Sequence, residues 1–77
     1  MSDEEKHKIS VIFGERVRTL RKARGLSQKQ ISIITRLDRS YIGGVERGER
    51  NVSLYNIFKI ATALDIKLDE LFKDFDV

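Results

Sequence analysis

The sequence predicts a compact all-α protein of five helices, and three observations support this fold class. The 77-residue chain contains no proline, its apolar residues recur at helical spacing, and signals for helix starts repeat along it. A chain of this length buries only about 60% of the surface that its unfolded form exposes. We therefore expect a single domain at residues 8–77, preceded by a disordered tail at residues 1–7.

The first helix is expected over residues 8–24. An apolar stripe at spacings of four, four and three residues consists of Ile9, Phe13, Val17 and Leu20. Such a stripe is typical of a helix that faces a core. Gly25 follows as the left-handed residue expected after a helix end.

Each of the four later helices begins with an apolar residue, a cap position and a second apolar residue four positions after the cap. The four instances are Leu26, Ser27 and Ile31; Leu37, Asp38 and Ile42; Val52, Ser53 and Ile57; and Ile66, Lys67 and Leu71. Ser and Asp side chains accept hydrogen bonds from first-turn amides, and the apolar pair forms a hydrophobic staple. Gln30 completes a capping box with Ser27, whereas Lys67 cannot cap with its side chain. With Gly48 as a stop signal, the expected ranges are 27–35, 38–47, 53–64 and 67–73.

Only Arg36 and Leu37 separate the second helix from the cap of the third. Two short helices joined so tightly cross steeply, which is the geometry of a helix-turn-helix. The side of the third helix opposite its apolar residues shows Arg39, Ser40, Gly43, Gly44 and Arg47. Because a recognition helix presents its amino-terminal residues to base edges, Arg39 and Ser40 are the best-placed readers of DNA.

Two adjacent glycines, Gly43 and Gly44, lie in the middle of this third helix. Each costs about 1 kcal/mol relative to alanine in a helix interior. A functional interpretation is that the bare surface lets the helix settle closer to the bases or tolerate bent DNA. A structural interpretation is that one glycine allows close packing of a neighbouring helix.

Charge is unevenly distributed along the chain. Residues 15–50 carry ten Lys and Arg against four Asp and Glu, within a chain of net charge +3. This basic region suggests a face for a polyanion, and the alternative is an ordinary solvated face. Phosphate contacts are expected at Gln28, Arg47, Arg50, Asn51 and Ser53. Tyr41 either borders the DNA or covers the edge of the core.

Composition argues against several other classes of protein. The chain has no cysteine, and its single histidine lies in a polar stretch, so we expect no metal site, no cofactor and no enzymatic activity. The GGVERG segment lacks the spacing of a phosphate-binding loop. No apolar run approaches the roughly 20 residues that span a bilayer, and no signal peptide is apparent. We expect a cytoplasmic protein without a membrane partner or a small-molecule ligand.

The segment SQKQISIITRLDRSYIGGVERGERNVSL resembles the helix-turn-helix of the XRE, Cro and CI repressor family, and LDELF matches the usual last helix of that family. More narrowly, LDRSYIGGVERGERNVSL is similar to the controller proteins of bacterial restriction-modification systems. The resemblance implies a phosphate contact from Gln28, base reading from Arg39 and Ser40, and a structural ion pair between Arg21 and Glu46.

Two positions depart from the family pattern. The turn position that often holds glycine is Arg36 here, which implies backbone strain. The late position of the third helix that often bears a reading side chain is Gly44, so base specificity from that site is in doubt.

The resemblance also implies a function. Controllers of this kind resemble autoregulators: homodimers that bind paired half-sites on double-stranded DNA near their own promoter, activate at low occupancy and repress at high occupancy. RNA polymerase is then a candidate further partner. An antitoxin-type or phage-type repressor with a protein partner is the alternative.

The acidic carboxyl-terminal helices are more apolar than one small helix requires, so they could supply a two-fold interface. The residues predicted for this dimer interface are Leu64, Ile66, Leu68, Phe72 and Phe75. The alternative is that these residues complete the core of the monomer.

Overall fold

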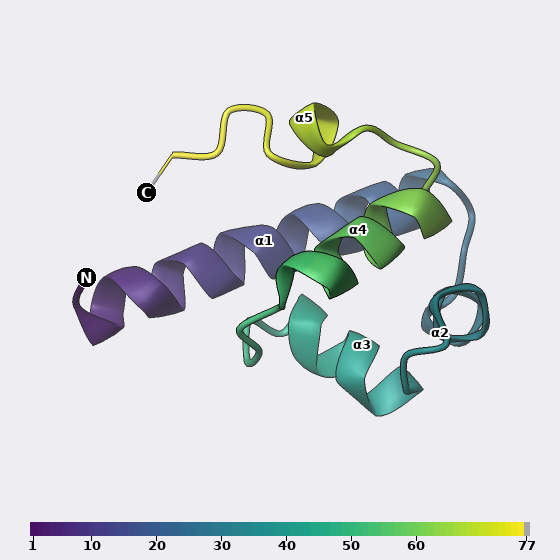
Figure 1. Cartoon of the computed structure of the whole chain (residues 1–77), viewed down its shortest axis with the longest axis horizontal. Coiled ribbons are helices and arrows are strands. Elements are labelled where there is room, and N and C mark those ends of the chain that lie inside the picture. The colour runs from purple at the N-terminus through teal and green to yellow at the C-terminus, as the bar shows by residue number, and fades with distance from the viewer. Residues whose placement is uncertain (77) are drawn as a thin grey trace.

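Five helices form the fold in a computed structural model that describes residues 1–76 (Figure 1). They are α1 (Asp3–Ala23), α2 (Gln28–Thr35), α3 (Arg39–Glu46), α4 (Leu54–Ala63) and α5 (Leu68–Leu71). The predicted all-α class and the order of the helices are confirmed. Figure 1 shows α1 along the length of the molecule, with α3 on one side of it and α5 with the carboxyl-terminal segment on the other.

Helix α1 begins at Asp3, so the prediction of a disordered tail at residues 1–7 is corrected. The Ser2 hydroxyl accepts a hydrogen bond from the Glu5 amide at 3.1 Å, and the Glu5 carboxylate accepts one from the Ser2 amide at 3.0 Å. This capping box satisfies two donors that the helix would otherwise leave unpaired. The acidic first turn also lies where the helix dipole favours negative charge. The signal was present in the sequence as SDEE, within a stretch interpreted as polar tail.

The capping box predicted for α2 is present. Ser27 accepts from the Gln30 amide at 3.0 Å, and the Gln30 side chain accepts from the Ser27 amide at 2.8 Å. Gly25 and Gly48 adopt the expected left-handed conformation after α1 and α3, with φ of +69° and +76°. These local signals therefore define where the helices begin and end.

The starts of the other helices agree with the prediction less uniformly. Ser53 caps α4 by accepting from the Asn56 amide at 3.2 Å. Asp38 occupies the cap position of α3, but its carboxylate caps no amide in the described part of the chain. Lys67 likewise supplies no side-chain cap to α5 within residues 1–76, as expected from its chemistry.

All five helices contribute to the core. Its buried apolar residues are Phe13, Val17, Ile31, Ile42, Val45, Ile60, Ala61, Leu64 and Leu71. The staple residues Leu26, Leu37, Val52 and Ile66 pack around this cluster. The core thereby fixes α3 between α1 and α2 and leaves the far side of α3 free.

Backbone contact between α1 and the end of α3 depends on Gly14. A Cβ atom at Gly14 would overlap the carbonyl oxygen of Val45 and lie 2.8 Å from that of Glu46. On the other side of the same contact, a Cβ at Gly48 would lie 2.9 Å from the Cα of Val11. Only residues without a side chain allow the two helices to approach this closely.

The carboxyl-terminal segment is held on α1 by one arginine and one aromatic contact. The Arg16 guanidinium donates to the backbone carbonyls of three residues, Glu70, Leu71 and Lys73. The ring of Phe72 stacks on Phe13 with centroids 5.7 Å apart. Arg16 therefore satisfies carbonyls that the short helix α5 leaves without partners of its own.

Candidate nucleic-acid interface

The turn between α2 and α3 contains the strained residue that the sequence indicated. Arg36 has φ +60°, in the left-handed region that residues with a side chain rarely adopt. The Thr35 hydroxyl stabilises the turn, because it donates to the Ile31 carbonyl at 2.7 Å and accepts from the Leu37 amide at 3.2 Å. The turn directs α3 across α2.

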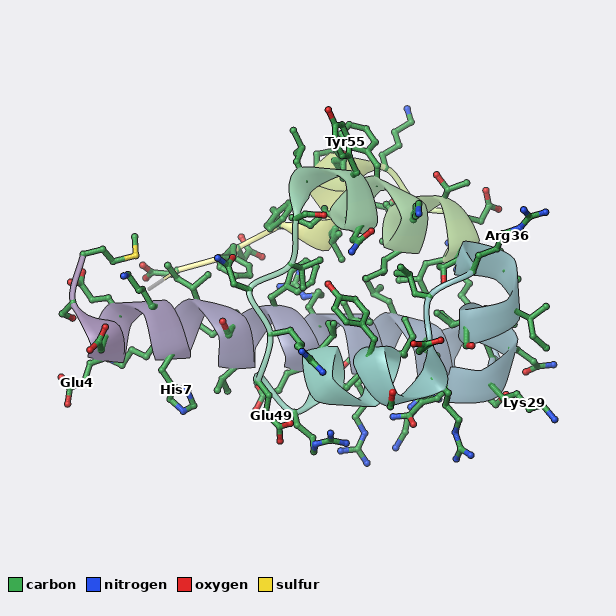
Figure 2. All side chains as sticks on the ribbon, turned by 60° about the horizontal axis from the view of Figure 1, so that its bottom comes forward. Glu4, His7, Lys29, Arg36, Glu49 and Tyr55 are labelled. Carbon is green, nitrogen blue, oxygen red and sulfur yellow. The ribbon has the colours of Figure 1, made fainter. Side chains whose placement is uncertain are left out.

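Arg39 and Ser40, the predicted base readers, are both exposed in the first turn of α3. Figure 2 shows nitrogen-tipped side chains projecting from the side of the molecule that carries α3, with Lys29 and Glu49 at its two ends. Tyr55 points away on the opposite side of the molecule. The residues predicted to read bases thus belong to the helix on this side of the molecule and are exposed in its first turn.

Gly43 and Gly44 do not leave α3 bare, contrary to expectation, because two arginine side chains lie over them. A Cβ at Gly43 would lie 3.0 Å from Nη1 of Arg47, and a Cβ at Gly44 would lie 3.1 Å from Nε of Arg50. Both glycines are buried as a result. The side chains nearest to the two glycines are those of Arg47 and Arg50, together with Gln28 of the neighbouring helix α2, whose Oε1 would lie 3.7 Å from a Cβ at Gly43. The functional interpretation of the glycines stays a prediction.

Arg47 is paired with a carboxylate. Its Nε and Nη2 donate to the two carboxylate oxygens of Glu49 at 2.8 Å and 3.2 Å, and both side chains are exposed. These hydrogen bonds raise the pKa of Arg47 and lower the pKa of Glu49, because each charged form stabilises the other. The guanidinium is therefore already bound to an anion in the free chain.

The side chain of Tyr41 extends from α3 towards α4, and the residue is half-buried. Its hydroxyl oxygen accepts a hydrogen bond from the Asn56 side-chain amide at 3.2 Å. The Arg50 guanidinium lies over its ring, 5.4 Å from the centroid, at the distance of a cation–π contact. Of the two roles considered for Tyr41, this geometry supports the one at the edge of the core.

Arg21 and Glu46 form a bidentate ion pair that joins α1 to α3. Arg21 Nε donates to Glu46 Oε2 at 2.7 Å, and Arg21 Nη2 donates to Glu46 Oε1 at 3.0 Å. Their side chains are only 10% and 3% exposed. The hydrogen bond to the carboxylate raises the pKa of Arg21, although burial alone would lower it.

Gln28, the predicted phosphate ligand at the start of α2, also contacts this ion pair. Its Nε2 donates to Glu46 Oε1 at 3.1 Å. The remaining phosphate candidates, Asn51 and Ser53, are exposed in the loop before α4, and the Ser53 hydroxyl is occupied by the cap. Arg50 and Asn51 also line an apolar pocket of about 180 Å³ with Phe72 and Phe75.

The predicted dimer interface is only partly available. Leu64 is fully buried in the core, so its assignment to an interface is corrected. Phe72 is partly exposed, while Ile66, Leu68 and Phe75 are half-buried against the core. For these residues the alternative, completion of the monomer core, describes the structure better.

Sequence reasoning missed a group of exposed apolar residues on α4. Leu54, Tyr55 and Phe58 on α4 are 64%, 80% and 50% exposed. Phe58 lies four residues after Leu54 and three after Tyr55, so it shares a helix face with both. Ile34 of α2 continues this surface, since it lines a shallow groove together with Phe58. The signal was a run of apolar residues wider than the core-facing stripe of α4.

Two observations concern other kinds of site. In residues 1–76, no group of three or more His, Cys, Asp and Glu side chains could hold a metal ion. No helix described for this chain is long and apolar enough to cross a membrane.

Comparison with known proteins places this arrangement in a family. A family model described as helix-turn-helix matches residues 17–71. The chain is 44% identical over 69 residues to the control protein C.MunI of a Mycoplasma species. These residues cover 88% of this chain and 93% of that protein. It is 64% identical to the restriction-modification controller protein C.AhdI from Aeromonas hydrophila, with a TM-score of 0.78 over 80% of this chain and 94% of that chain.

A second solved structure shares the fold at lower identity. The controller protein C.Esp1396I was crystallised as a tetramer in complex with its natural 35 base-pair operator. Its identity to this chain is 23%, with a TM-score of 0.73 over 84% of this chain and 96% of that chain. On the family match and the identity to control proteins along nearly their whole length, this chain belongs to the helix-turn-helix family, among its restriction-modification controller proteins.

Proposed function

We propose that this protein is a sequence-specific DNA-binding transcription regulator that acts as a homodimer on a two-fold operator and controls its own restriction-modification operon. The observation that carries the proposal is the outer face of α3, where exposed Arg39 and Ser40 precede two arginines that lie across the same helix. The relatives that bear the name of control protein support the regulatory role. Activation at low occupancy would require RNA polymerase as a further partner.

In this proposal Arg39 reads a base. It is exposed at the amino-terminal end of α3, the part of a recognition helix that enters the major groove. Its planar guanidinium can donate to O6 and N7 of one guanine together, which the single hydroxyl donor of Ser40 cannot do. Ser40 contributes less selectively.

Arg47, Arg50 and Gln28 contact phosphates on either side of the groove. Arg47 and Arg50 lie over the middle of α3, and Gln28 begins α2, where first-turn amides favour an anion. Asn51 and the amides after Ser53 would add a contact at the start of α4. These contacts strengthen binding to any sequence and do not choose among them.

We assign the dimer interface to α4 rather than to the carboxyl-terminal residues. Leu54, Tyr55 and Phe58 expose more apolar surface than Phe72 does, and none of the three belongs to the buried core. Large exposed apolar side chains that share one face typically mark a protein contact. A second copy that presents the same face would cover them in a two-fold arrangement.

Fluorescence anisotropy tests the function directly. The protein is titrated at about 150 mM salt onto a duplex from immediately upstream of its own gene, with random duplex as the comparison. We expect affinities that differ by roughly a thousandfold or more. Weak, equal and steeply salt-dependent binding to both duplexes would contradict a specific autoregulator and favour a protein partner.

In the same assay, Arg39→Ala distinguishes recognition of a base from sequence-independent attraction to DNA. We expect a loss of about 1–3 kcal/mol on the operator, with relaxed specificity at one base pair per half-site. Arg50→Ala is the matched control, since it should weaken both duplexes alike and reduce the salt dependence. Equal losses on both duplexes for Arg39→Ala would refute base reading.

A further inference from the structure

The buried Arg21–Glu46 pair has a third member on the DNA-facing side of the molecule. Glu46 Oε1 accepts from Arg21 Nη2 and also from Gln28 Nε2, at 3.0 Å and 3.1 Å. The Glu46 carboxylate lies at the end of α3, whereas Gln28 begins α2. One buried carboxylate thus joins the core ion pair to a half-buried amide at the start of the helix-turn-helix.

Arg21 holds that carboxylate in one position. Its Nε and Nη2 occupy both oxygens of Glu46, and its Nη1 donates to the Leu26 carbonyl at 2.8 Å. The guanidinium is therefore fixed on two sides, by α3 and by the loop that precedes α2. A bidentate contact leaves the carboxylate little freedom to rotate.

A fixed carboxylate determines which way the Gln28 amide faces. An ionised carboxylate only accepts hydrogen bonds, so the NH₂ group of the amide must face Glu46 and the carbonyl oxygen must face away from it. The oxygen and the NH₂ group of an amide have nearly the same shape. Without Glu46, the Gln28 amide could therefore rotate by half a turn, so that its donor and its acceptor exchange places. Gln28 Oε1 lies on the side of Gly43, at the ordinary van der Waals distance of 3.7 Å from the position that a Cβ there would take.

We propose that Glu46 is a positioning residue for DNA binding: held by Arg21, it orients the side-chain amide of Gln28 so that one N–H bonds to Glu46 and the second is available to a backbone phosphate. This inference rests on the proposed function, in which Gln28 contacts a phosphate. In this inference the ion pair has a role in DNA binding. If the pair were purely structural, the contribution of Gln28 to DNA affinity would not depend on it.

A double-mutant comparison tests the coupling. Arg21→Met combined with Glu46→Leu replaces the ion pair by apolar side chains, a change that buried pairs often tolerate. Gln28→Ala is then made in the wild-type chain and in this background, and binding to operator and random duplex is measured by anisotropy. Gln30→Ala is the matched control, because Gln30 bonds to Ser27 and not to Glu46.

In the wild-type chain we expect Gln28→Ala to weaken binding about tenfold on both duplexes, as for a lost hydrogen bond to a charged group. In the apolar background the loss of DNA affinity caused by Gln28→Ala should be less than about twofold. The effect of Gln30→Ala on affinity should be the same in both backgrounds. A Gln28→Ala loss of equal size in both backgrounds would overturn the positioning role. No loss in the wild-type chain would instead remove Gln28 from the proposed phosphate contacts.

A second measurement applies to the wild-type chain and does not depend on the folding of the variant. The two side-chain amide protons of Gln28 are followed by NMR as operator duplex is added. We expect the proton bonded to Glu46 to keep its chemical shift while the other moves. Rapid exchange of the two protons in the free chain, or equal shifts of both on binding, would contradict the proposal.

Discussion

Helices α3 and α4 are both short and amphipathic, yet their outer faces differ in chemistry. The exposed side chains of α3 are Arg39 and Ser40, with Arg47 directly after the helix. Those of α4 include Leu54, Tyr55 and Phe58. A charged face suits a polyanion and an apolar face suits another protein surface, so the proposed function assigns a different kind of partner to each of these neighbouring helices.

The two helices also place their exposed groups by different means. On α3, glycines without side chains let Arg47 and Arg50 lie across the helix. On α4, the large side chains project directly from the helix. The DNA-facing surface therefore depends on glycine and backbone contacts, whereas the apolar surface depends on the side chains themselves.

The largest effect is expected where α3 meets α1. Gly14→Ala places a Cβ against the Val45 carbonyl, a clash with backbone that cannot move aside. We expect a loss of about 3 kcal/mol in the free energy of unfolding, at the upper end of overpacking effects. Urea denaturation at fixed protein concentration measures it.

Gly25→Ala is the control for this prediction. Gly25 has a positive φ, but a Cβ there would meet no neighbouring atom within 4 Å, so we expect a smaller loss of about 1 kcal/mol from backbone strain alone. Equal losses for the two variants would show that the contact between α1 and α3 is looser than the structure indicates.

The second prediction concerns the apolar face of α4. Phe58→Ser removes a large exposed side chain, so we expect the dimer dissociation constant to rise about thirtyfold while the monomer remains folded. Phe72→Ser should instead lower stability, since Phe72 stacks on Phe13, and leave dimerisation unchanged. Sedimentation equilibrium distinguishes them, and the reverse pattern would return the interface to the carboxyl-terminal residues.

The third prediction concerns the arginine that lies over Gly44. Gly44→Ala should raise the free energy of unfolding by up to about 1 kcal/mol through helix propensity, because the exposed Arg50 side chain can move aside. DNA affinity should fall as Arg50 is displaced. In an Arg50→Ala background the same change should leave affinity unaltered, and a persistent loss there would mean that the glycine acts on DNA directly.

The smallest effect is expected at Glu49. Glu49→Gln removes the carboxylate that pairs with Arg47, so binding to random duplex should tighten about two- to fivefold. Glu4→Gln, which changes the net charge equally at the far end of α1, should have no such effect. An equal gain from both variants would mean that only net charge matters, and anisotropy at constant salt decides between the two.

Much of the fold could be predicted because its signals are local. The Ser27 cap, its capping box with Gln30 and the left-handed Gly25 each involve residues within three positions of one another. The SDEE segment carries the same kind of local signal, since Ser2 and Glu5 form a capping box three residues apart. Asp38 shows its limit, since a cap residue in the expected position makes no capping bond in the described chain.

The candidate site was predicted in outline. Position along α3 suffices to make Arg39 and Ser40 exposed at its first turn. It does not reveal that Tyr41 bonds to Asn56 of α4, or that Leu64 is buried. Those outcomes depend on how the helices pack, which a single-helix pattern does not contain.

Local sequence was sufficient for the helices, their order and the tight turn between α2 and α3, because each depends on hydrogen bonds and apolar spacing within one stretch of chain. Packing of the whole chain was needed to bury Leu64, to leave the apolar surface of α4 free, and to join Arg21 to Gln28 through Glu46. The contacts of Glu46 link residues far apart in the sequence, 25 positions for Arg21 and 18 for Gln28, so they arise only once the core has placed α1, α2 and α3 together.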